Sequence, residues 1–205
     1  MSALPVKYKT YLTAFEGMLE SYCARLSCPR GLADAMRYSL LAGGKRLRPV
    51  LFFAALDAFG GEWEKESGLA LALECIHTYS LIHDDLPAMD NDDLRRGKPS
   101  SHKQFGEGNA ILAGDALLTT AFEVIGDAPL SAKARTGAVQ ALARGAGARG
   151  MVFGQELDIA WEGKPASEET LRKIHRHKTG ALINAAVQMG AVAAGADSAQ
   201  RQALE

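Results

Sequence analysis

Residues 64–87 read EKESGLALALECIHTYSLIHDDLP, and this stretch decides the fold class. Its apolar side chains recur at spacings of three and four, which is the period of an α-helix. Pro87 ends the pattern, because proline disfavours helix in the residue before it. The same spacing recurs over nearly every other segment, and almost no segment alternates with the period of two that a strand requires. We therefore predict an all-α chain with one helix from residue 64 to Pro87.

The other predicted helices are bounded by glycine, proline and capping residues. Ser167 stands where the last of them begins, and its hydroxyl is suited to cap the first turn. Residues 89–108 are charged and contain glycine, so we predict a long loop there, of a length that often carries function. The predicted helices cover about residues 6–26, 31–41, 48–60, 109–125, 131–161 and 167–194.

Composition limits the classes of function. A chain of 205 residues with 47% apolar residues can bury one core, which favours a single domain. Its 23 basic and 24 acidic residues leave a net charge of -1, so we expect no general affinity for nucleic acid or anionic membrane. No secretory signal or membrane span is expected. The three cysteines, Cys23, Cys28 and Cys75, lack a CxxC spacing, which favours reduced thiols and a cytoplasmic protein.

Three carboxylates follow the predicted central helix, at Asp84, Asp85 and Asp90. Magnesium takes oxygen ligands and keeps several waters, so a few carboxylates together with phosphate oxygens are sufficient to bind it. The first two carboxylates close the helix, where the helix dipole favours a bound cation, and Pro87 turns the chain back. A lone pair of aspartates is usually a solvated loop, so the interpretation as a metal site depends on its surroundings.

Those surroundings are basic. Arg95 and Arg96 follow the aspartates, and they could bind anionic oxygens or simply pair with the neighbouring carboxylates. His77 lies seven residues before Asp84, on the same face of the helix and about 10 Å away. The stretch GGKRLRP at residues 43–49 adds a second cationic cluster. Its lysine is Lys45 and its second arginine is Arg48, and it does not match the Walker pattern.

Two other metal-binding motifs share residues with the acidic run. An EF-hand beginning at Asp90 would need an oxygen ligand where Leu94 stands and glycine where Arg95 stands, so it fails. The pair His83 and Asp84 is compatible with a metal-dependent phosphohydrolase of the HD type, which remains an alternative. That alternative gives no role to the two basic clusters.

With these residues in place, the sequence resembles the trans-isoprenyl diphosphate synthases, and in particular the bacterial farnesyl diphosphate synthase (geranyltranstransferase) type. The resemblance implies the isoprenoid synthase fold, an all-α bundle around a central apolar cavity. It implies that residues 1–205 belong to a single polyprenyl synthase domain and form its N-terminal two-thirds. The motifs that carry it are GGKRLRP at 43–49, residues 74–102, NAILAGDALLTTAF at 109–122, GQELD at 154–158, and Lys178 with Thr179.

The resemblance also implies roles for individual residues. Magnesium would bridge the first aspartate-rich motif to an allylic diphosphate, with Asp84, Asp85 and Asp90 as ligands and Asp84 and Asp90 the firmest. Arg95, Lys178 and Thr179 would contact the allylic diphosphate, and Asp84, Arg95 and Lys178 would assist its departure. Gln155 and Asp158 would line the upper wall. The diphosphate of isopentenyl diphosphate would be held by Lys45, Arg48, His77 and Arg96.

The implied reaction condenses isopentenyl diphosphate with dimethylallyl or geranyl diphosphate. Ionisation of the allylic diphosphate, condensation and elimination give farnesyl diphosphate, and the chemistry needs charge stabilisation on the leaving group and exclusion of water. Tyr79 and Ser80 stand where the family sets product length, which indicates a C15 product. Geranyl or geranylgeranyl diphosphate synthase activity remains an alternative.

The chain departs from the family's pattern in one respect. A second aspartate-rich motif, DDxxD, is absent, since the only Asp-Asp pairs are residues 84–85 and 92–93. We expect that the C-terminal helices are missing and that the sequence is a fragment, so activity of these 205 residues alone is doubtful. A noncatalytic regulatory homologue is the alternative. The resemblance further implies a homodimer formed through about residues 109–125.

Overall fold

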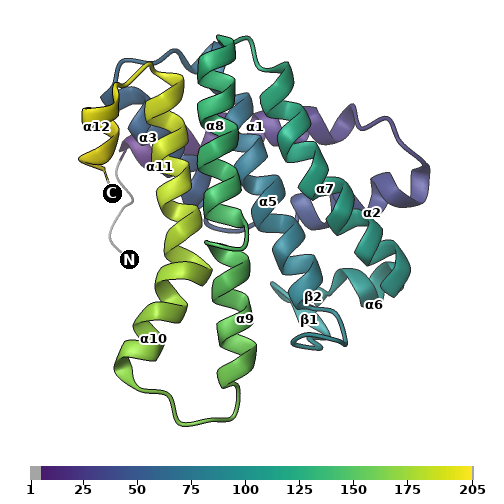
Figure 1. Cartoon of the computed structure of the whole chain (residues 1–205). Coiled ribbons are helices and arrows are strands. Elements are labelled where there is room, and N and C mark those ends of the chain that lie inside the picture. The colour runs from purple at the N-terminus through teal and green to yellow at the C-terminus, as the bar shows by residue number, and fades with distance from the viewer. Residues whose placement is uncertain (1–5, 205) are drawn as a thin grey trace.

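The computed structural model describes residues 6–204, and helices make up most of them (Figure 1). The all-α prediction is therefore confirmed, and most predicted helix ends lie within two residues of the observed ones. In chain order, the elements are α1 (Val6–Ala24), α2 (Arg30–Leu40), α3 (Leu47–Ala58), α4 (Trp63–Glu66), α5 (Gly68–Asp84), β1 (Leu94–Arg95), β2 (Lys98–Pro99), α6 (Ser101–Phe105), α7 (Glu107–Asp127), α8 (Ala132–Ala146), α9 (Met151–Trp161), α10 (Glu168–His175), the π-helical turn η1 (Arg176–Gly180), α11 (Ala181–Ala193) and α12 (Ser198–Gln202).

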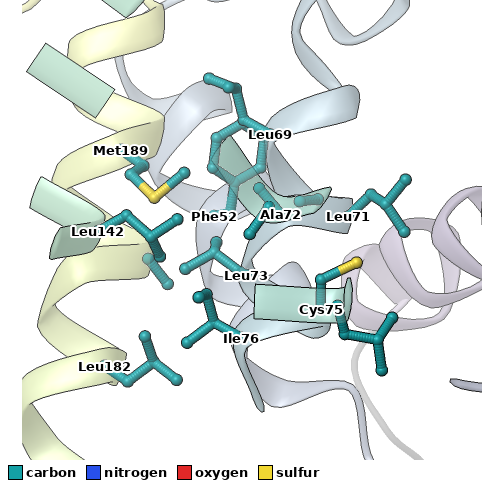
Figure 2. Packing of buried hydrophobic residues seen from close by; sticks show 14 of the residues in the cluster. Phe52, Leu69, Leu71, Ala72, Leu73, Cys75, Ile76, Leu142, Leu182 and Met189 are labelled. Carbon is teal, nitrogen blue, oxygen red and sulfur yellow. The ribbon is translucent and has the colours of Figure 1, made fainter. Parts of the chain in front are cut away.

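Helix α5 is the centre of the bundle and is buried on nearly all sides. A helix that is apolar all round is expected in a core rather than at a surface. It packs most extensively against α7, while α11 packs against α3 and α8. Figure 2 shows part of this core, with Leu73 and Ile76 of α5 near Leu142 of α8 and Leu182 and Met189 of α11.

Two predicted helices are each divided in the structure. The helix predicted from residue 64 to Pro87 comprises α4 and α5, because Ser67 and Gly68 at the junction are poor helix formers. There the carboxylate of Glu66 also turns back to accept a hydrogen bond from the backbone N–H of Glu62, at 2.6 Å. The helix predicted over residues 131–161 comprises α8 and α9.

The break between α8 and α9 depends on glycine. The backbone of Gly150 has φ -129° and ψ -121°, far from helical values. A Cβ at this position would lie only 2.2 Å from the carbonyl oxygen of Gly145. The glycines were expected to be tolerated inside one helix, but here they allow a tight turn, and α9 projects beside α10 at one end of the bundle (Figure 1).

The loop predicted over residues 89–108 is partly ordered into secondary structure. Strands β1 and β2 form an antiparallel hairpin in which Leu94 lies opposite Pro99. Its turn residues, Arg96 and Gly97, both have positive φ, at 55° and 78°, which a two-residue hairpin of this twist requires. Helix α6 follows, and α7 already begins at Glu107.

The helix predicted over residues 167–194 is confirmed, with one irregularity. Ser167 caps it as predicted, since its hydroxyl oxygen accepts a hydrogen bond from the backbone N–H of Thr170 at 3.1 Å. The irregularity is η1, a π-helical turn between α10 and α11. Turns of this kind often occur at functional sites, and η1 contains the predicted Lys178 and Thr179.

Helix α7 is long and apolar enough to cross a membrane by length and composition, although no membrane span was predicted. A core helix passes the same test. One face of α7 packs against α5, with Ala113, Leu117 and Ala121 fully buried. We therefore interpret α7 as a core helix.

Candidate active site

Two adjoining cavities lie where α5 ends. The larger, of about 760 Å³, lies between α5, α9 and η1, and the smaller, of about 550 Å³, lies beside residues 42–48. Arg48 and His77 line both cavities, so the two are neighbours rather than separate sites. The larger also contains Asp84, Lys178 and Thr179, and the smaller contains Lys45 and Arg96.

The two adjacent aspartates have different surroundings. Asp84 lines the larger cavity, whereas Asp85 is 2% exposed and faces the hairpin. There Asp85 accepts hydrogen bonds from Nε of Arg95, at 2.9 and 3.2 Å, and from Nη2 of the same guanidinium. Nη2 of Arg95 also lies 3.4 Å from Asp92. The alternative in which arginine pairs with a neighbouring carboxylate is therefore the observed arrangement for Asp85 and Arg95, and neither lines the larger cavity.

Asp84 is a partly buried carboxylate without an ion pair inside 4.0 Å among residues 6–204. Burial raises its pKa to about 6, the positive charge of Lys178 opposes this rise, and the negative charge of Asp90 adds to it. Asp90 is exposed, and its backbone N–H donates to the carbonyl oxygen of Asp84 at 2.8 Å. The turn at Pro87 thus brings the first and third aspartates together, as the sequence predicted.

The four residues predicted for the second diphosphate are brought together around the smaller cavity. Lys45 and Arg96 are exposed there, and Nε of Arg48 is buried without a hydrogen-bond partner within the described chain. Burial, followed by the positive charges of Arg48 and Arg96, lowers the pKa of His77 to about 3. His77 is therefore neutral at physiological pH and can act there as a hydrogen-bond donor or acceptor, not as a cation.

Lys178 faces the acidic turn from the other wall of the larger cavity. Its Nζ donates to Asp158 of α9 at 2.5 Å. The contact between α9 and η1 is unusually close at Gly154, where a Cβ would lie 2.0 Å from the backbone nitrogen of Lys178. The π-helical turn and this glycine together set the position of Lys178 and of the neighbouring Thr179.

The larger cavity also contains the residues predicted to set product length. Tyr79 and Ser80 line it, one turn or more before Asp84 along α5. The ring of Tyr79 packs edge-on against His83, with 5.7 Å between ring centroids. Gln155 lines the same cavity, and both polar atoms of its side-chain amide are buried without a partner in the described residues.

Two residues of the site were not predicted, Arg46 and Glu74. Both line the smaller cavity, and both are buried, at 4% and 2% exposed. Nη1 of Arg46 donates to Glu74 at 2.6 Å. The available signal was the acidic residue at position 74, three residues before His77 and therefore on a similar face of an otherwise apolar helix.

The structure of a synthase from Zymomonas mobilis resembles this chain closely. That structure, described as an apo farnesyl/geranylfarnesyl diphosphate (FPP/GFPP) synthase, has a TM-score of 0.90 and 40% sequence identity, and the match covers 97% of this chain and 75% of the other. The profile of the family described as Polyprenyl synthetase matches residues 29–205. The chain belongs to the polyprenyl synthetase family. The predicted isoprenoid synthase fold is confirmed by these matches.

Curated members of the polyprenyl synthetase family match over nearly the whole chain. A farnesyl diphosphate synthase of Geobacillus stearothermophilus is 50% identical over 195 residues, which are 94% of this chain and 66% of that protein. A chloroplastic geranylgeranyl pyrophosphate synthase of Capsicum annuum is 51% identical over 179 residues, covering 86% and 48% respectively. The chain thus spans about half to two-thirds of the length of these relatives.

The oxygen ligands near the larger cavity fit magnesium only in part. Within the described residues there is no group of three or more His, Cys, Asp and Glu side chains arranged to hold a metal ion. Asp84 lines the larger cavity, and Asp90 lies near enough for its negative charge to raise the pKa of Asp84. Magnesium is commonly bound by one or two carboxylates together with phosphate oxygens and water, so this pair fits the ion when a diphosphate completes its ligands.

Proposed function

We propose that the protein is a trans-prenyltransferase that condenses isopentenyl diphosphate with dimethylallyl or geranyl diphosphate to give farnesyl diphosphate. The observation that carries the proposal is the pair of adjoining cavities joined at Arg48 and His77. The larger is lined by Asp84 and Lys178, which suits a metal-bound diphosphate, and the smaller is lined by Lys45, Arg48 and Arg96, which suits a second diphosphate. Membership of the polyprenyl synthetase family supports this assignment.

Each diphosphate would have its own ligands. Asp84 and Asp90 would hold magnesium, which when bound would neutralise charge on the allylic diphosphate. Asp85 would act differently from the expectation, by holding Arg95 near the same turn. Lys45, Arg48 and Arg96 would bind the diphosphate of isopentenyl diphosphate, and neutral His77 would donate a hydrogen bond to it.

Lys178 is suited to assist the departure of the allylic diphosphate. Its Nζ is held by Asp158 at 2.5 Å and faces the cavity that Asp84 lines. A diphosphate carries more negative charge than one carboxylate, so Lys178 can exchange Asp158 for the leaving group as charge develops there. Thr179, next to it, would donate a hydrogen bond, and Arg95 would add charge from the side of the hairpin.

The walls of the larger cavity suit a reactive cation. Met151, Val152 and Ile159 of α9 give this cavity an apolar wall, which would help to keep water away from a bound cation. The amide oxygen of Gln155, which has no partner in the described chain, can face positive charge without acting as a nucleophile. Tyr79 closes part of this space, so we propose that it limits the product to C15, with geranyl or geranylgeranyl diphosphate as the alternative products.

Several wider features belong to the same proposal. We propose a single polyprenyl synthase domain, a cytoplasmic location, and no binding to nucleic acid or insertion into membrane. A homodimer through α7 is supported by two apolar side chains that α7 exposes, Ile111 at 44% and Leu112 at 58%. The noncatalytic homologue is the alternative that an assay must exclude.

The deciding experiment is a magnesium-dependent assay with isopentenyl diphosphate and geranyl diphosphate, followed by analysis of product chain length. Intact mass would first establish the length of the protein assayed. Release of diphosphate with formation of a C15 product is the expected result. If a protein of the length of its relatives binds both substrates but forms no product, the catalytic assignment is wrong and the regulatory alternative is favoured.

A further inference from the structure

Lys45 and Arg48, in the loop before α3 and in its first turn, are separated by an arginine whose side chain is buried. Arg46 lies between them in the sequence, yet its side chain is 1% exposed, while Lys45 is exposed to the smaller cavity. Its backbone is left-handed, with φ 47° and ψ 36°, a conformation that residues other than glycine seldom adopt. Such an arrangement persists only where the surroundings hold the residue in place.

Every part of the Arg46 guanidinium has a partner. Nε donates to Glu16 of α1 at 2.8 Å, Nη1 donates to Glu74 of α5 at 2.6 Å, and Nη2 donates to the carbonyl oxygen of Leu40 at 2.9 Å. Three different helices therefore hold one side chain. Because the fork of arginine is rigid and planar, these bonds fix its orientation and not only its charge.

Two further contacts hold the same loop. The hydroxyl of Tyr8 donates to the carbonyl oxygen of Lys45 at 2.5 Å. A Cβ on Gly44 would lie 2.7 Å from the guanidinium carbon of Arg96, so the absence of a side chain there allows Arg96 to lie against the loop. Glu74 itself lies one turn before His77 on α5 and lines the same cavity.

We propose that Arg46, held by Glu74 and Glu16, is a positioning residue that fixes the loop so that Lys45, Arg48 and Arg96 converge on one diphosphate. The inference rests on the proposed function of that cavity. In this arrangement Glu74 is essential for binding an anion, although Glu74 itself carries a negative charge. Several like charges otherwise repel one another, and an anchored backbone keeps them together before the ligand arrives.

The test separates position from charge. Glu74→Gln removes a negative charge beside an anion site, so a purely electrostatic role predicts tighter binding of the anion. Positioning predicts weaker binding. The double variant Arg46→Met with Glu74→Met leaves the net charge unchanged and exchanges a buried pair for apolar side chains, which proteins often tolerate. Charge alone predicts unchanged affinity for that variant, and positioning predicts a loss.

The measurement is the dissociation constant of isopentenyl diphosphate, determined by calorimetry on the folded protein with its unfolding midpoint recorded. Glu74→Gln and the double variant should each bind isopentenyl diphosphate at least about tenfold more weakly than the wild type. A change of this size corresponds to the loss of one hydrogen bond to a charged group. Tyr8→Phe, which removes only the bond to Lys45, provides a milder change and should weaken binding by a few fold. Tyr22→Phe, outside both cavities, is its control and should leave the affinity unchanged.

Failure of the positioning role of Arg46 and failure of the proposed diphosphate site give different results. If the wild type does not bind isopentenyl diphosphate, or if Arg48→Met does not weaken binding, the diphosphate site is wrong and this inference falls with it. If Arg48→Met weakens binding while the double variant and Tyr8→Phe bind as the wild type does, the site stands and the positioning role of Arg46 is overturned.

Discussion

Gly154 offers a sharp test of how the two walls of the larger cavity are held together. A Cβ at this position would lie 2.0 Å from the backbone nitrogen of Lys178 and 2.5 Å from its Cα. Ordinary contact begins at 3.4 Å, so Gly154→Ala requires α9 and η1 to separate by about 1.4 Å at this point. Both neighbours are backbone atoms of helices, which cannot rotate away as a side chain can.

The expected cost has two opposing parts. Alanine is favoured over glycine inside a helix by about 1 kcal/mol. Overpacking of a rigid contact costs about 1–3 kcal/mol, so we expect a net loss of stability of up to about 2 kcal/mol. The separation also moves Lys178 away from Asp158 and from the acidic turn, and a displacement near 1 Å in a catalytic group can reduce turnover by about a hundredfold.

The matched control is Gly17→Ala in α1. Gly17 is also inside a helix, but a Cβ there would meet nothing within 4 Å. This variant should be more stable than the wild type by about 0.5–1 kcal/mol and equally active. Thermal unfolding should therefore shift the two variants in opposite directions, and the prenyltransferase assay should show a loss of activity only for Gly154→Ala. If Gly154→Ala is as stable and as active as Gly17→Ala, the close contact does not position Lys178 and the reasoning is refuted.

Three further predictions concern product length, pH and a helix cap. Tyr79→Ala in the complete enzyme should yield products longer than C15, and an unchanged product would refute its role in closing the cavity. Hydrogen bonds from Tyr11 and Lys7 lower the pKa of Asp57, so its stabilising contribution is full above about pH 4 and is lost as the pH falls through the lowered value. Urea unfolding should show Asp57→Asn less stable by about 1–3 kcal/mol at pH 7, with the difference shrinking at pH 3; a constant difference would contradict this. Ser167→Ala should lower stability by about 1 kcal/mol in thermal unfolding, and an unchanged midpoint would argue against the cap.

The sequence predicted many of the residues that line the two cavities, but not Arg46 or Glu74. His77 and Asp84 share a face because they are two helical turns apart, and Gly43 and Gly44 mark the loop that follows the helix ending at Leu40. The positions of breaks inside helices were not predictable in the same way. Whether Gly150 interrupts a helix depends on the close approach of the Gly145 carbonyl, a tertiary property that composition does not contain. The π-helical turn at Lys178 likewise depends on its packing against Gly154.

The two adjacent aspartates, Asp84 and Asp85, show most directly what the sequence could not predict about the site. Successive residues of a helix point about 100° apart, so Asp84 and Asp85 could not both face one cavity, but the pattern alone did not decide which would. The decision comes from the hairpin, whose turn at Arg96 and Gly97 returns Arg95 to the side of α5 where Asp85 lies. Arg95 then satisfies the buried carboxylate of Asp85 and leaves Asp84 without a protein cation inside 4.0 Å in the described part of the chain. A carboxylate buried without a partner is costly, and an ion bound at the cavity mouth would relieve that cost. The pairing of one aspartate is thus what leaves the other available for a ligand.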